Sequence, residues 1–269
     1  MSVVLVTGCS SGFGLAFATA FAQRGDQVVA TMRDTSRAPN RLTGVDVRQM
    51  DVTKSETFAA IVDGILRDYG RIDVLVNNAG IATIGAVEVL DDQAFRSVFE
   101  TNFFGAMALS RAVLPHMRKQ GSGRIIFMSA VGALLNTAYL SAYCTSKAAL
   151  SSLAAAIDTE VRPFGIRVSA ILPSAYKTEI AGNMTLAADE RTVYEKASRG
   201  YFAGLTQRII EGPADLSPVV DAVLHAATSE QPRHMYLVAP RLAEVLQPLV
   251  DGLEKLHEHE MELTRPLQG

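Results

Sequence analysis

Seven short apolar segments recur along the chain, separated by stretches in which apolar residues return at every third or fourth position. Such near-continuous apolar runs are typical of strands in a parallel sheet whose two faces are both covered. Alternation of these strands with helices predicts an α/β fold, a doubly wound parallel sheet of about seven strands. The expected strands lie at 2–6, 27–31, 45–50, 72–76, 124–128, 166–172 and 235–238, and the clearest helical patterns at 13–24, 55–69, 92–119 and 145–162.

We find no internal repeat, low-complexity tract or proline- and serine-rich linker, so one domain over residues 1–269 is expected. The irregular zone 179–214 combines four glycines with aromatic side chains such as Tyr194 and Tyr201. Connections of this length in a compact domain are usually functional. We therefore interpret the zone as a helical lid over a substrate pocket, with a plain surface excursion as the alternative.

The C-terminal segment 241–263 also has helical spacing. Its apolar positions are expected on one buried face that packs on the domain or on a second subunit, and Pro248 is expected to kink the helix or divide it. His257 and His259 are interpreted as part of a solvated, charged helix end, and no metal site is expected. The apolar positions are Leu242, Val245, Leu246, Leu249, Leu253 and Leu256.

The composition argues against nucleic-acid binding. The chain has 25 Lys and Arg residues against 28 Asp and Glu, a formal net charge of -3 and a pI of about 6.0, whereas nucleic-acid-binding domains are usually basic. We find neither a secretory leader nor an apolar stretch near the roughly 18 residues that span a membrane. Two cysteines, Cys9 and Cys144, are too few for a disulfide framework. We therefore expect a cytoplasmic protein with free thiols and no membrane partner.

A glycine-rich turn follows the first expected strand. Residues 7–14 read TGCSSGFG, and a helical pattern opens at Phe13. A strand, a glycine turn and a helix N-terminus form an anion site, because unpaired backbone N–H groups and the helix dipole both favour a phosphate there. We expect Gly8 to allow the tight turn, Gly12 the close approach of a pyrophosphate, and Gly14 close helix-to-strand packing. The motif indicates a Rossmann-type dinucleotide site, with a ligand-free glycine turn as the alternative.

The end of the second strand bears on which dinucleotide binds. An acidic side chain there would hold the ribose 2′-OH of NAD, and a cation would accept the 2′-phosphate of NADP. The strand ends at Met32, followed by Arg33 and Asp34. Asp34 has the spacing of an NAD-type acid, but Met32 occupies the strand-end position, and Arg33 together with Ser10 can bind a phosphate. NADP is therefore predicted in preference to NAD.

A second motif, YCTSK at 143–147, opens another helical pattern. Tyr143 and Lys147 are spaced i and i+4, so they share a helix face, and the ammonium group is expected to favour the phenolate. A phenol whose pKa is lowered from about 10 can act as a general acid or base near neutral pH. The motif gains specificity from NNAG at 77–80, directly after the fourth strand, and from Asn102 in TNFFG.

In this order, over residues 2–178, the motifs resemble the short-chain dehydrogenase/reductase family, and among its members most closely the 17β-hydroxysteroid and retinol dehydrogenases. The resemblance implies hydride transfer between nicotinamide and a carbonyl carbon, with Tyr143 as proton donor or acceptor. Lys147 would lower the tyrosine pKa and hold the nicotinamide ribose, and Asn102 would support a water relay. The cofactor-binding residues so implied are Gly8, Ser10, Ser11, Gly12, Phe13, Gly14, Arg33, Asp51, Val52, Asn78, Ala79, Gly80, Tyr143, Lys147, Pro173 and Thr178.

The resemblance also implies a substrate and an assembly. The substrate would be a small hydrophobic ketone, aldehyde or alcohol. The chain would form a homodimer or homotetramer through the long helices near 92–119 and 145–162.

One position departs from the family pattern. The family has a serine that hydrogen-bonds the substrate oxygen, but counting forward from the GR of GRIIFMSAVG and back thirteen residues from Tyr143 leads both times to Ala130. Either the chain is a variant, natural or engineered, without this hydroxyl, or Ser129 reaches the site through a local backbone shift. Agreement of the two counts favours the first interpretation.

Two functions of different classes follow. The first is an NADP(H)-dependent oxidoreductase that interconverts a hydrophobic carbonyl compound and its alcohol. The alternative is a catalytically weakened dinucleotide-binding sensor or scaffold protein. Ala130 favours the alternative, whereas Asn102, Tyr143 and Lys147 favour the enzyme.

Overall fold

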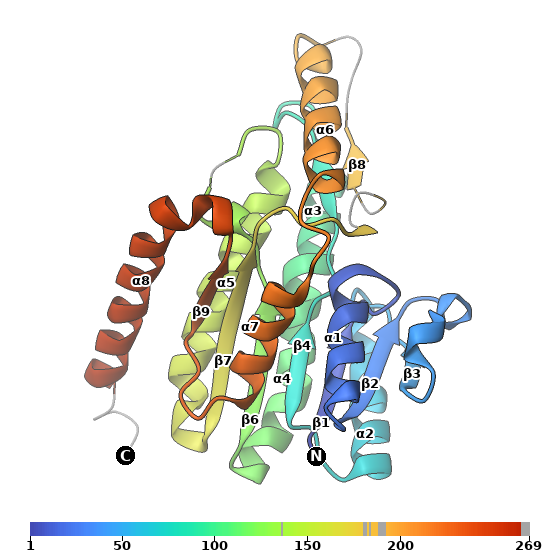
Figure 1. Cartoon of the computed structure of the whole chain (residues 1–269), viewed down its shortest axis with the longest axis vertical. Coiled ribbons are helices and arrows are strands. Elements are labelled where there is room, and N and C mark those ends of the chain that lie inside the picture. Colours follow the sequence, from blue (N-terminus) through green and yellow to red (C-terminus); the bar gives the residue numbers. More distant parts are fainter. Residues whose placement is uncertain (136, 180–181, 183, 188–191, 265–269) are drawn as a thin grey trace.

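A seven-stranded parallel sheet forms the centre of the computed structural model, which describes residues 1–135, 137–179, 182, 184–187 and 192–264 (Figure 1). Its strand order is β3-β2-β1-β4-β6-β7-β9. All seven expected strands are present, so the doubly wound α/β fold is confirmed. The strands are β1 (Val3–Thr7), β2 (Gln27–Met32), β3 (Asp46–Gln49), β4 (Val74–Asn77), β6 (Gly123–Met128), β7 (Ile166–Pro173) and β9 (Met235–Val238).

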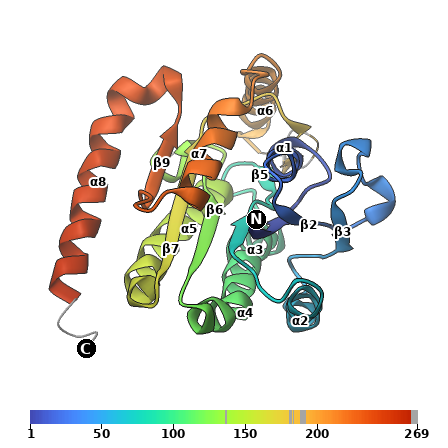
Figure 2. The same cartoon turned by 60° about the horizontal axis from the view of Figure 1, so that its bottom comes forward.

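Helices cover both faces of the sheet (Figure 2). One face carries α1 (Gly12–Gln23) and α7 (Ser217–Thr228), and the other carries α2 (Phe58–Tyr69), α4 (Gly105–Gln120) and α5 (Ser141–Val161). Successive strand residues alternate between the two apolar layers, because side chains point to opposite faces. In β1, Leu5 packs on the side of α2, α4 and α5, and Val6 packs on the side of α1 and α7. This double burial explains the continuous apolar runs.

The order of the strands creates a crevice at the carboxyl end of the sheet. Strand β1 pairs with β2 on one side and with β4 on the other. The chain moves outward from β1 to β2 and β3, then returns to β4, so the loops that follow β1 and β4 leave in opposite directions. Ligands of open α/β sheets bind at such a switch point.

The expected helix 92–119 is divided into three parts in the structure. It consists of α3 (Asp92–Phe99), a π-helical segment (Glu100–Phe104) and α4. Two short strands that the sequence did not predict, β5 (Ala82–Ile84) and β8 (Met184–Leu186), pair in parallel. The predicted lid zone 179–214 contributes β8 and the helix α6 (Glu195–Ile210), which lie at the top of Figure 1. Its residues 180, 181, 183 and 188–191 lie outside the described ones.

The C-terminal helix α8 (Ala243–Thr264) is assigned as one helix with Pro248 inside it. Its path bends near its N-terminal end in both views (Figures 1 and 2), so the predicted kink is favoured over a division into two helices. The predicted buried face is confirmed at Leu246 and Leu253, which pack toward the core, but it is wrong at Val245, Leu249 and Leu256, which are exposed. Val250 is buried in their place.

A polar contact explains the orientation of α8. His257, on the same helix face as Leu246 and Val250, is 7% exposed, and its Nε2 lies 2.9 Å from Oδ2 of Asp158. Asp158 is fully buried on α5, and its pKa is held well below the usual range because hydrogen bonds from His257, Arg162 and the backbone of Val168 outweigh the effect of burial. The solvated environment predicted for His257 is therefore wrong.

Candidate active site

The glycine turn between β1 and α1 is shaped by close contacts. Gly8 and Gly12 have positive φ angles of 73° and 55°, a conformation that favours glycine. A Cβ atom at Gly14 would lie 2.3 Å from the carbonyl oxygen of Gly8 and 2.5 Å from Nδ2 of Asn78. Gly14 therefore allows the first turn of α1 to pack on the glycine turn itself, rather than on the strand as the sequence predicted.

Hydrogen bonds lock the turns after β1 and β4 together. Asn78 Nδ2 donates to the carbonyl oxygens of Thr7 at 2.9 Å and of Gly8 at 3.2 Å. In return, Thr7 Oγ1 accepts the N–H groups of Asn78 at 3.0 Å and of Ala79 at 3.1 Å. These four hydrogen bonds fix the turn after β1 and the turn after β4, which form the two sides of the crevice, relative to each other.

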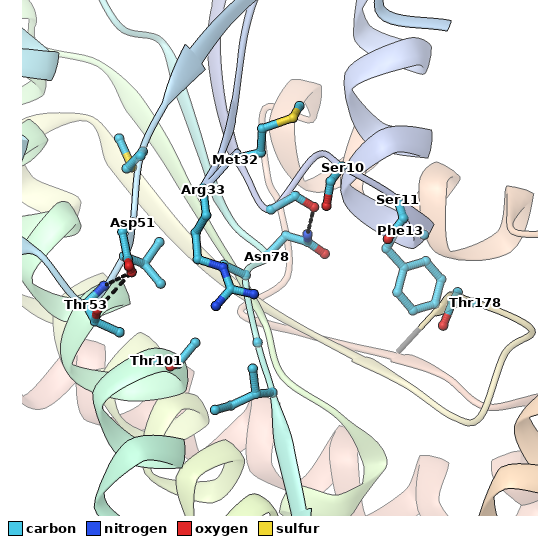
Figure 3. A pocket seen from close by; sticks show the side chains of 17 residues that line it. Ser10, Ser11, Phe13, Met32, Arg33, Asp51, Thr53, Asn78, Thr101 and Thr178 are labelled. Atoms are coloured by element: carbon cyan, nitrogen blue, oxygen red, sulfur yellow. Dashed lines mark hydrogen bonds between the residues drawn. The ribbon is translucent and has the colours of Figure 1, made fainter. Parts of the chain in front are cut away.

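A pocket occupies this crevice (Figure 3). It brings together most of the predicted cofactor-binding residues: Gly8, Ser10, Ser11, Gly12, Phe13, Arg33, Asp51, Val52, Asn78, Ala79, Gly80 and Thr178. The predicted residues Gly14, Tyr143, Lys147 and Pro173 are not in its lining, and Pro173 pairs with Val238 in the sheet. The lining also includes Met32, Met50, Thr53, Ile81 and Thr101, which were not predicted to bind and whose only sequence signal is their position beside motif residues.

Charged side chains occupy one end of the pocket, where Figure 3 shows Arg33 reaching across between Asp51 and Asn78. Arg33 is exposed. Its backbone carbonyl oxygen accepts a hydrogen bond from Nε2 of Gln49 at 3.0 Å. Burial alone would raise the pKa of Asp51, but the hydrogen bonds of Thr53 and the charge of Arg33 lower it overall. Asp34 instead caps the next turn by accepting from the N–H of Ser36 at 3.0 Å and is outside the lining.

Lys147 lies beside Gly80, a residue of the pocket lining. Its side chain is 5% exposed, and its Nζ donates to the carbonyl oxygen of Met128 at 2.7 Å. A Cβ atom on Gly80, which lines the pocket, would be 3.5 Å from this Nζ and 3.3 Å from Oδ1 of Asn102. Burial lowers the pKa of Lys147 to about 8. The ammonium group therefore reaches the edge of the dinucleotide pocket without lining it.

Tyr143, in the first turn of α5, is partly buried. Nζ of Lys147 lies over its ring, 5.7 Å from the centroid. Burial, with a smaller effect of Cys144, raises the pKa of Tyr143 above its ordinary value. The lowering expected from the lysine is therefore absent in this structure, because desolvation of the phenol dominates and the ammonium group is bonded to Met128.

Asn102 connects the turn after β4 with α5. It is 1% exposed and lies in the π-helical segment, a feature frequent at functional sites. Its Nδ2 donates to the carbonyl oxygen of Ile81 and to Oγ of Ser146, both at 3.0 Å, while its Oδ1 accepts from the N–H of Ile81 at 2.9 Å. Asn102 thereby fixes the backbone next to Gly80, and the water relay stays a prediction.

The structure separates Ser129 from Ala130. Ser129 Oγ donates to the carbonyl oxygen of Lys147 at 3.0 Å and lies 2.7 Å from Oγ of Ser151, so its hydroxyl is bonded to the inner side of α5. Ala130 follows at the start of a short 3-10 turn, and a Cβ atom on Gly132 in that turn would be 3.6 Å from Cε1 of Tyr143. The segment at Ala130 thus borders Tyr143, and the structure does not show the backbone shift that would bring Ser129 there.

Tyr143 packs in a cluster of apolar side chains from the lid zone and neighbouring segments. We call this set the lid cluster, and it is formed by β5, β8, α6, the start of α5 and the two residues before α5. Its members besides Tyr143 are Ile84, Tyr139, Leu140, Cys144, Met184, Leu186, Tyr201, Phe202 and Leu205. Tyr143 therefore belongs to an apolar cluster, and its ring faces the ammonium group of Lys147, which lies next to the polar pocket.

Comparison with known proteins identifies the family. The sequence profile described as short chain dehydrogenase matches residues 2–189. This chain belongs to the short-chain dehydrogenase family. It is similar to human retinol dehydrogenase 8, with 34% identity over 254 residues, covering 85% of this chain and 78% of that protein. It is also similar to human 17-beta-hydroxysteroid dehydrogenase type 1, with 31% identity over 268 residues, covering 93% and 81%.

A solved structure agrees with this assignment. A short-chain dehydrogenase from Streptomyces avermitilis shares 33% identity with a TM-score of 0.81, covering 98% of this chain and 97% of that one. The family prediction from the motifs is thereby confirmed. In the described part of this short-chain dehydrogenase, no helix is long and apolar enough to cross a membrane.

Proposed function

We propose that this short-chain dehydrogenase is an NADP(H)-dependent oxidoreductase that interconverts a hydrophobic ketone or aldehyde and the corresponding alcohol. The observation that carries the proposal is the position of Tyr143, which packs in the lid cluster while its ring faces the ammonium group of Lys147 beside the glycine-lined pocket. The pocket fits a dinucleotide, because Gly8 and Gly12, both with left-handed backbones, line it next to the N-terminus of α1, where free backbone N–H groups favour a phosphate. When bound, the nicotinamide supplies or accepts the hydride.

The side chains around Tyr143 would handle the proton. In reduction, the phenolic hydroxyl of Tyr143 donates a proton to the substrate oxygen, and in oxidation it takes that proton back. A raised pKa keeps this hydroxyl protonated, which suits the reduction. The ammonium group of Lys147 faces the phenol ring and stabilises negative charge that develops on the phenolic oxygen. Asn102 holds Gly80 and Ile81 in place beside the lysine.

A spectrophotometric assay tests the proposed reaction. We expect NADPH absorbance to fall when the protein is mixed with hydrophobic ketones or aldehydes, and to rise when NADP⁺ is mixed with the matching alcohols. The second candidate, a dinucleotide-binding sensor or scaffold, is supported by the missing hydroxyl at Ala130. Tight NADPH binding without turnover of any carbonyl compound, even in the Ala130→Ser variant, would establish the sensor instead.

The preference for NADP is proposed from Arg33. Its guanidinium group lies at the end of the pocket where the adenosine ribose would bind, and Asp34 is engaged with Ser36 outside the lining. We expect Arg33→Ala to raise the KM for NADPH about tenfold, the loss of one charge-assisted hydrogen bond, and to leave the KM for NADH nearly unchanged. Arg24→Ala is the matched control, because Arg24 is an exposed arginine outside the pocket lining that pairs with Asp26 at 3.0 Å. Equal catalytic efficiency with NADH in the wild-type protein contradicts the preference.

We also propose a homodimer or homotetramer formed through α3, the π-helical segment, α4 and α5. An aromatic row along α3 and the π-helical segment supports it: successive ring centroids of Phe95, Phe99, Phe103 and Phe104 are 5.6, 6.2 and 5.2 Å apart, and Phe104 is 43% exposed. Sedimentation velocity measures the assembly. A cytoplasmic location is proposed as well, because Cys9 and Cys144 are both free thiols.

A further inference from the structure

Ser146 lies between Tyr143 and Lys147 in the sequence of α5 and is fully buried. Its Oγ donates to the carbonyl oxygen of Tyr143 at 2.7 Å and accepts from Nδ2 of Asn102 at 3.0 Å. A serine hydroxyl has one proton, and a carbonyl oxygen can only accept, so the proton is directed to Tyr143. Towards Asn102, Ser146 therefore acts as an acceptor.

The side-chain amide of Asn102 joins this serine to the turn after β4. Nδ2 uses its two hydrogens for Ser146 and for the carbonyl oxygen of Ile81, and Oδ1 accepts from the N–H of Ile81. Ile81 lines the dinucleotide pocket. A chain of hydrogen bonds therefore runs from Ile81 through Asn102 and Ser146 to the carbonyl oxygen of Tyr143, and we call it the Ser146 bridge.

The bridge also places the amide oxygen of Asn102 beside Lys147. A Cβ atom on Gly80 would lie 3.3 Å from Oδ1 of Asn102 and 3.5 Å from Nζ of Lys147, so the two atoms border the same position. The amide oxygen carries partial negative charge, which favours the charged form of a nearby ammonium group. That ammonium group in turn faces the ring of Tyr143. The position of the amide therefore bears on the groups proposed to handle the proton.

We propose that Ser146 is a positioning residue of the active site. Through Asn102 it joins the pocket-lining residue Ile81 to the first turns of α5, which carry Tyr143. The proposal rests on the proposed function, since it takes Tyr143 as the proton donor. Without the hydroxyl of Ser146, one Nδ2 hydrogen of Asn102 loses its acceptor, and the amide is no longer bonded to α5. Small displacements of reacting groups slow the chemical step, so the loss should appear in kcat more than in binding.

A serine with the same two hydrogen bonds elsewhere in the fold provides a matched control. Ser110 is fully buried on α4, and its Oγ donates to the carbonyl oxygen of Ala106 at 2.8 Å and accepts from Nδ2 of Asn77 at 3.1 Å. Neither Ser110 nor Asn77 lines the pocket. Ser110→Ala and Ser146→Ala each leave one asparagine N–H group without its acceptor, so we expect similar decreases in the thermal midpoint.

Steady-state kinetics separates positioning from stability. We expect Ser146→Ala to lower kcat for reduction of a ketone by NADPH about tenfold, the loss of one hydrogen bond, and to leave the Kd for NADPH nearly unchanged. Ser110→Ala should leave kcat unchanged. In an Asn102→Ala background, Ser146→Ala should lower kcat little further, because the serine acts through Asn102. Equal losses of kcat in Ser146→Ala and Ser110→Ala, or an undiminished further loss in the Asn102→Ala background, overturn the positioning role.

The titration of Lys147 tests the bridge without turnover. Burial lowers the pKa of Lys147 to about 8. Among the described residues, the groups that face its Nζ are the ring of Tyr143 on α5, the carbonyl oxygen of Met128 on β6 and, next to Gly80, the amide of Asn102. Release of the amide in Ser146→Ala should make the ammonium group lose its proton at a lower pH, and reduction, which uses charged Lys147, should decline at that lower pH as well. NMR of protein labelled with ¹³C-lysine measures the titration, and Lys147→Arg assigns the resonance.

This measurement separates the failure of the inference from the failure of the proposed function. A Lys147 titration that is unchanged in Ser146→Ala overturns the Ser146 bridge and leaves the oxidoreductase intact. A titration that moves to lower pH in Ser146→Ala but not in Ser110→Ala supports the bridge. If the wild-type protein then turns over no carbonyl compound, the bridge is retained and the oxidoreductase is overturned.

Discussion

An Ala130→Ser variant is expected to turn over carbonyl substrates faster than the wild-type protein, by a factor of about 10²–10³ in kcat. Ala130 begins the turn that borders Tyr143, and a hydroxyl there would add a second donor for the substrate oxygen as charge develops on it. Such donors stabilise the transition state more than the ground state, so kcat should change more than KM. Steady-state kinetics with NADPH and one ketone at saturating concentration measures the effect.

The matched control changes the neighbouring serine. In Ser129→Ala, the hydroxyl that is removed is bonded to the carbonyl oxygen of Lys147 and to Ser151 inside the fold, so we expect a lower thermal midpoint and little change in kcat. If Ala130→Ser leaves kcat unchanged while Ser129→Ala abolishes activity, the register that assigns the family serine to position 130 is incorrect.

Replacing the phenol of Tyr143 should have the opposite effect. Tyr143→Phe is expected to lower kcat by about 10²–10⁴, the contribution of a positioned general acid or base. The phenylalanine ring keeps its place in the lid cluster and its position beside Lys147, so the folded structure and the Kd for NADPH should be unchanged. NADPH fluorescence measures the Kd, and stopped-flow absorbance under single-turnover conditions measures the chemical step.

Tyr69→Phe provides the control for loss of a phenolic hydroxyl, since Tyr69 is hydrogen-bonded to Asp46 at 2.9 Å on a different surface. It should leave the single-turnover rate unchanged. A Tyr143→Phe variant that keeps more than about a tenth of the wild-type rate is incompatible with Tyr143 as the proton donor.

The central sheet and the dinucleotide crevice could be predicted because their physical causes lie in local sequence. Burial on both faces gives β1 an uninterrupted apolar run, and the turn after it needs glycine at positions 8, 12 and 14. The strands β5 and β8 were missed because each has three residues, too few to show a periodic pattern. Thr53 and Thr101 were missed as pocket residues because roles were assigned only to their neighbours Val52 and Asn102, and only the fold shows that the two threonines also line the crevice.

Other differences arose from burial and long-range contacts. The orientation of α8 depends on His257 and Asp158, which are far apart in sequence, and hydropathy gives no weight to a buried polar pair. The i, i+4 spacing correctly places Lys147 near Tyr143, but spacing carries no information on desolvation, which raises the pKa of the tyrosine and lowers that of the lysine. Tyr139 has a left-handed backbone, with a φ of 63°, and its carbonyl oxygen accepts a hydrogen bond from the distant Gly85, so this conformation also depends on a long-range contact.

The two edge strands of the central sheet, β3 and β9, are protected against aggregation in different ways. An outer strand exposes unpaired backbone groups onto which another chain can add, which is a route to aggregation. Helix α8 lies along the edge strand β9 and covers it (Figure 2). The opposite edge strand, β3, is only four residues long and carries Asp46 and Arg48, charges that disfavour strand addition. Truncation before α8 would therefore uncover a template for cross-chain pairing at β9.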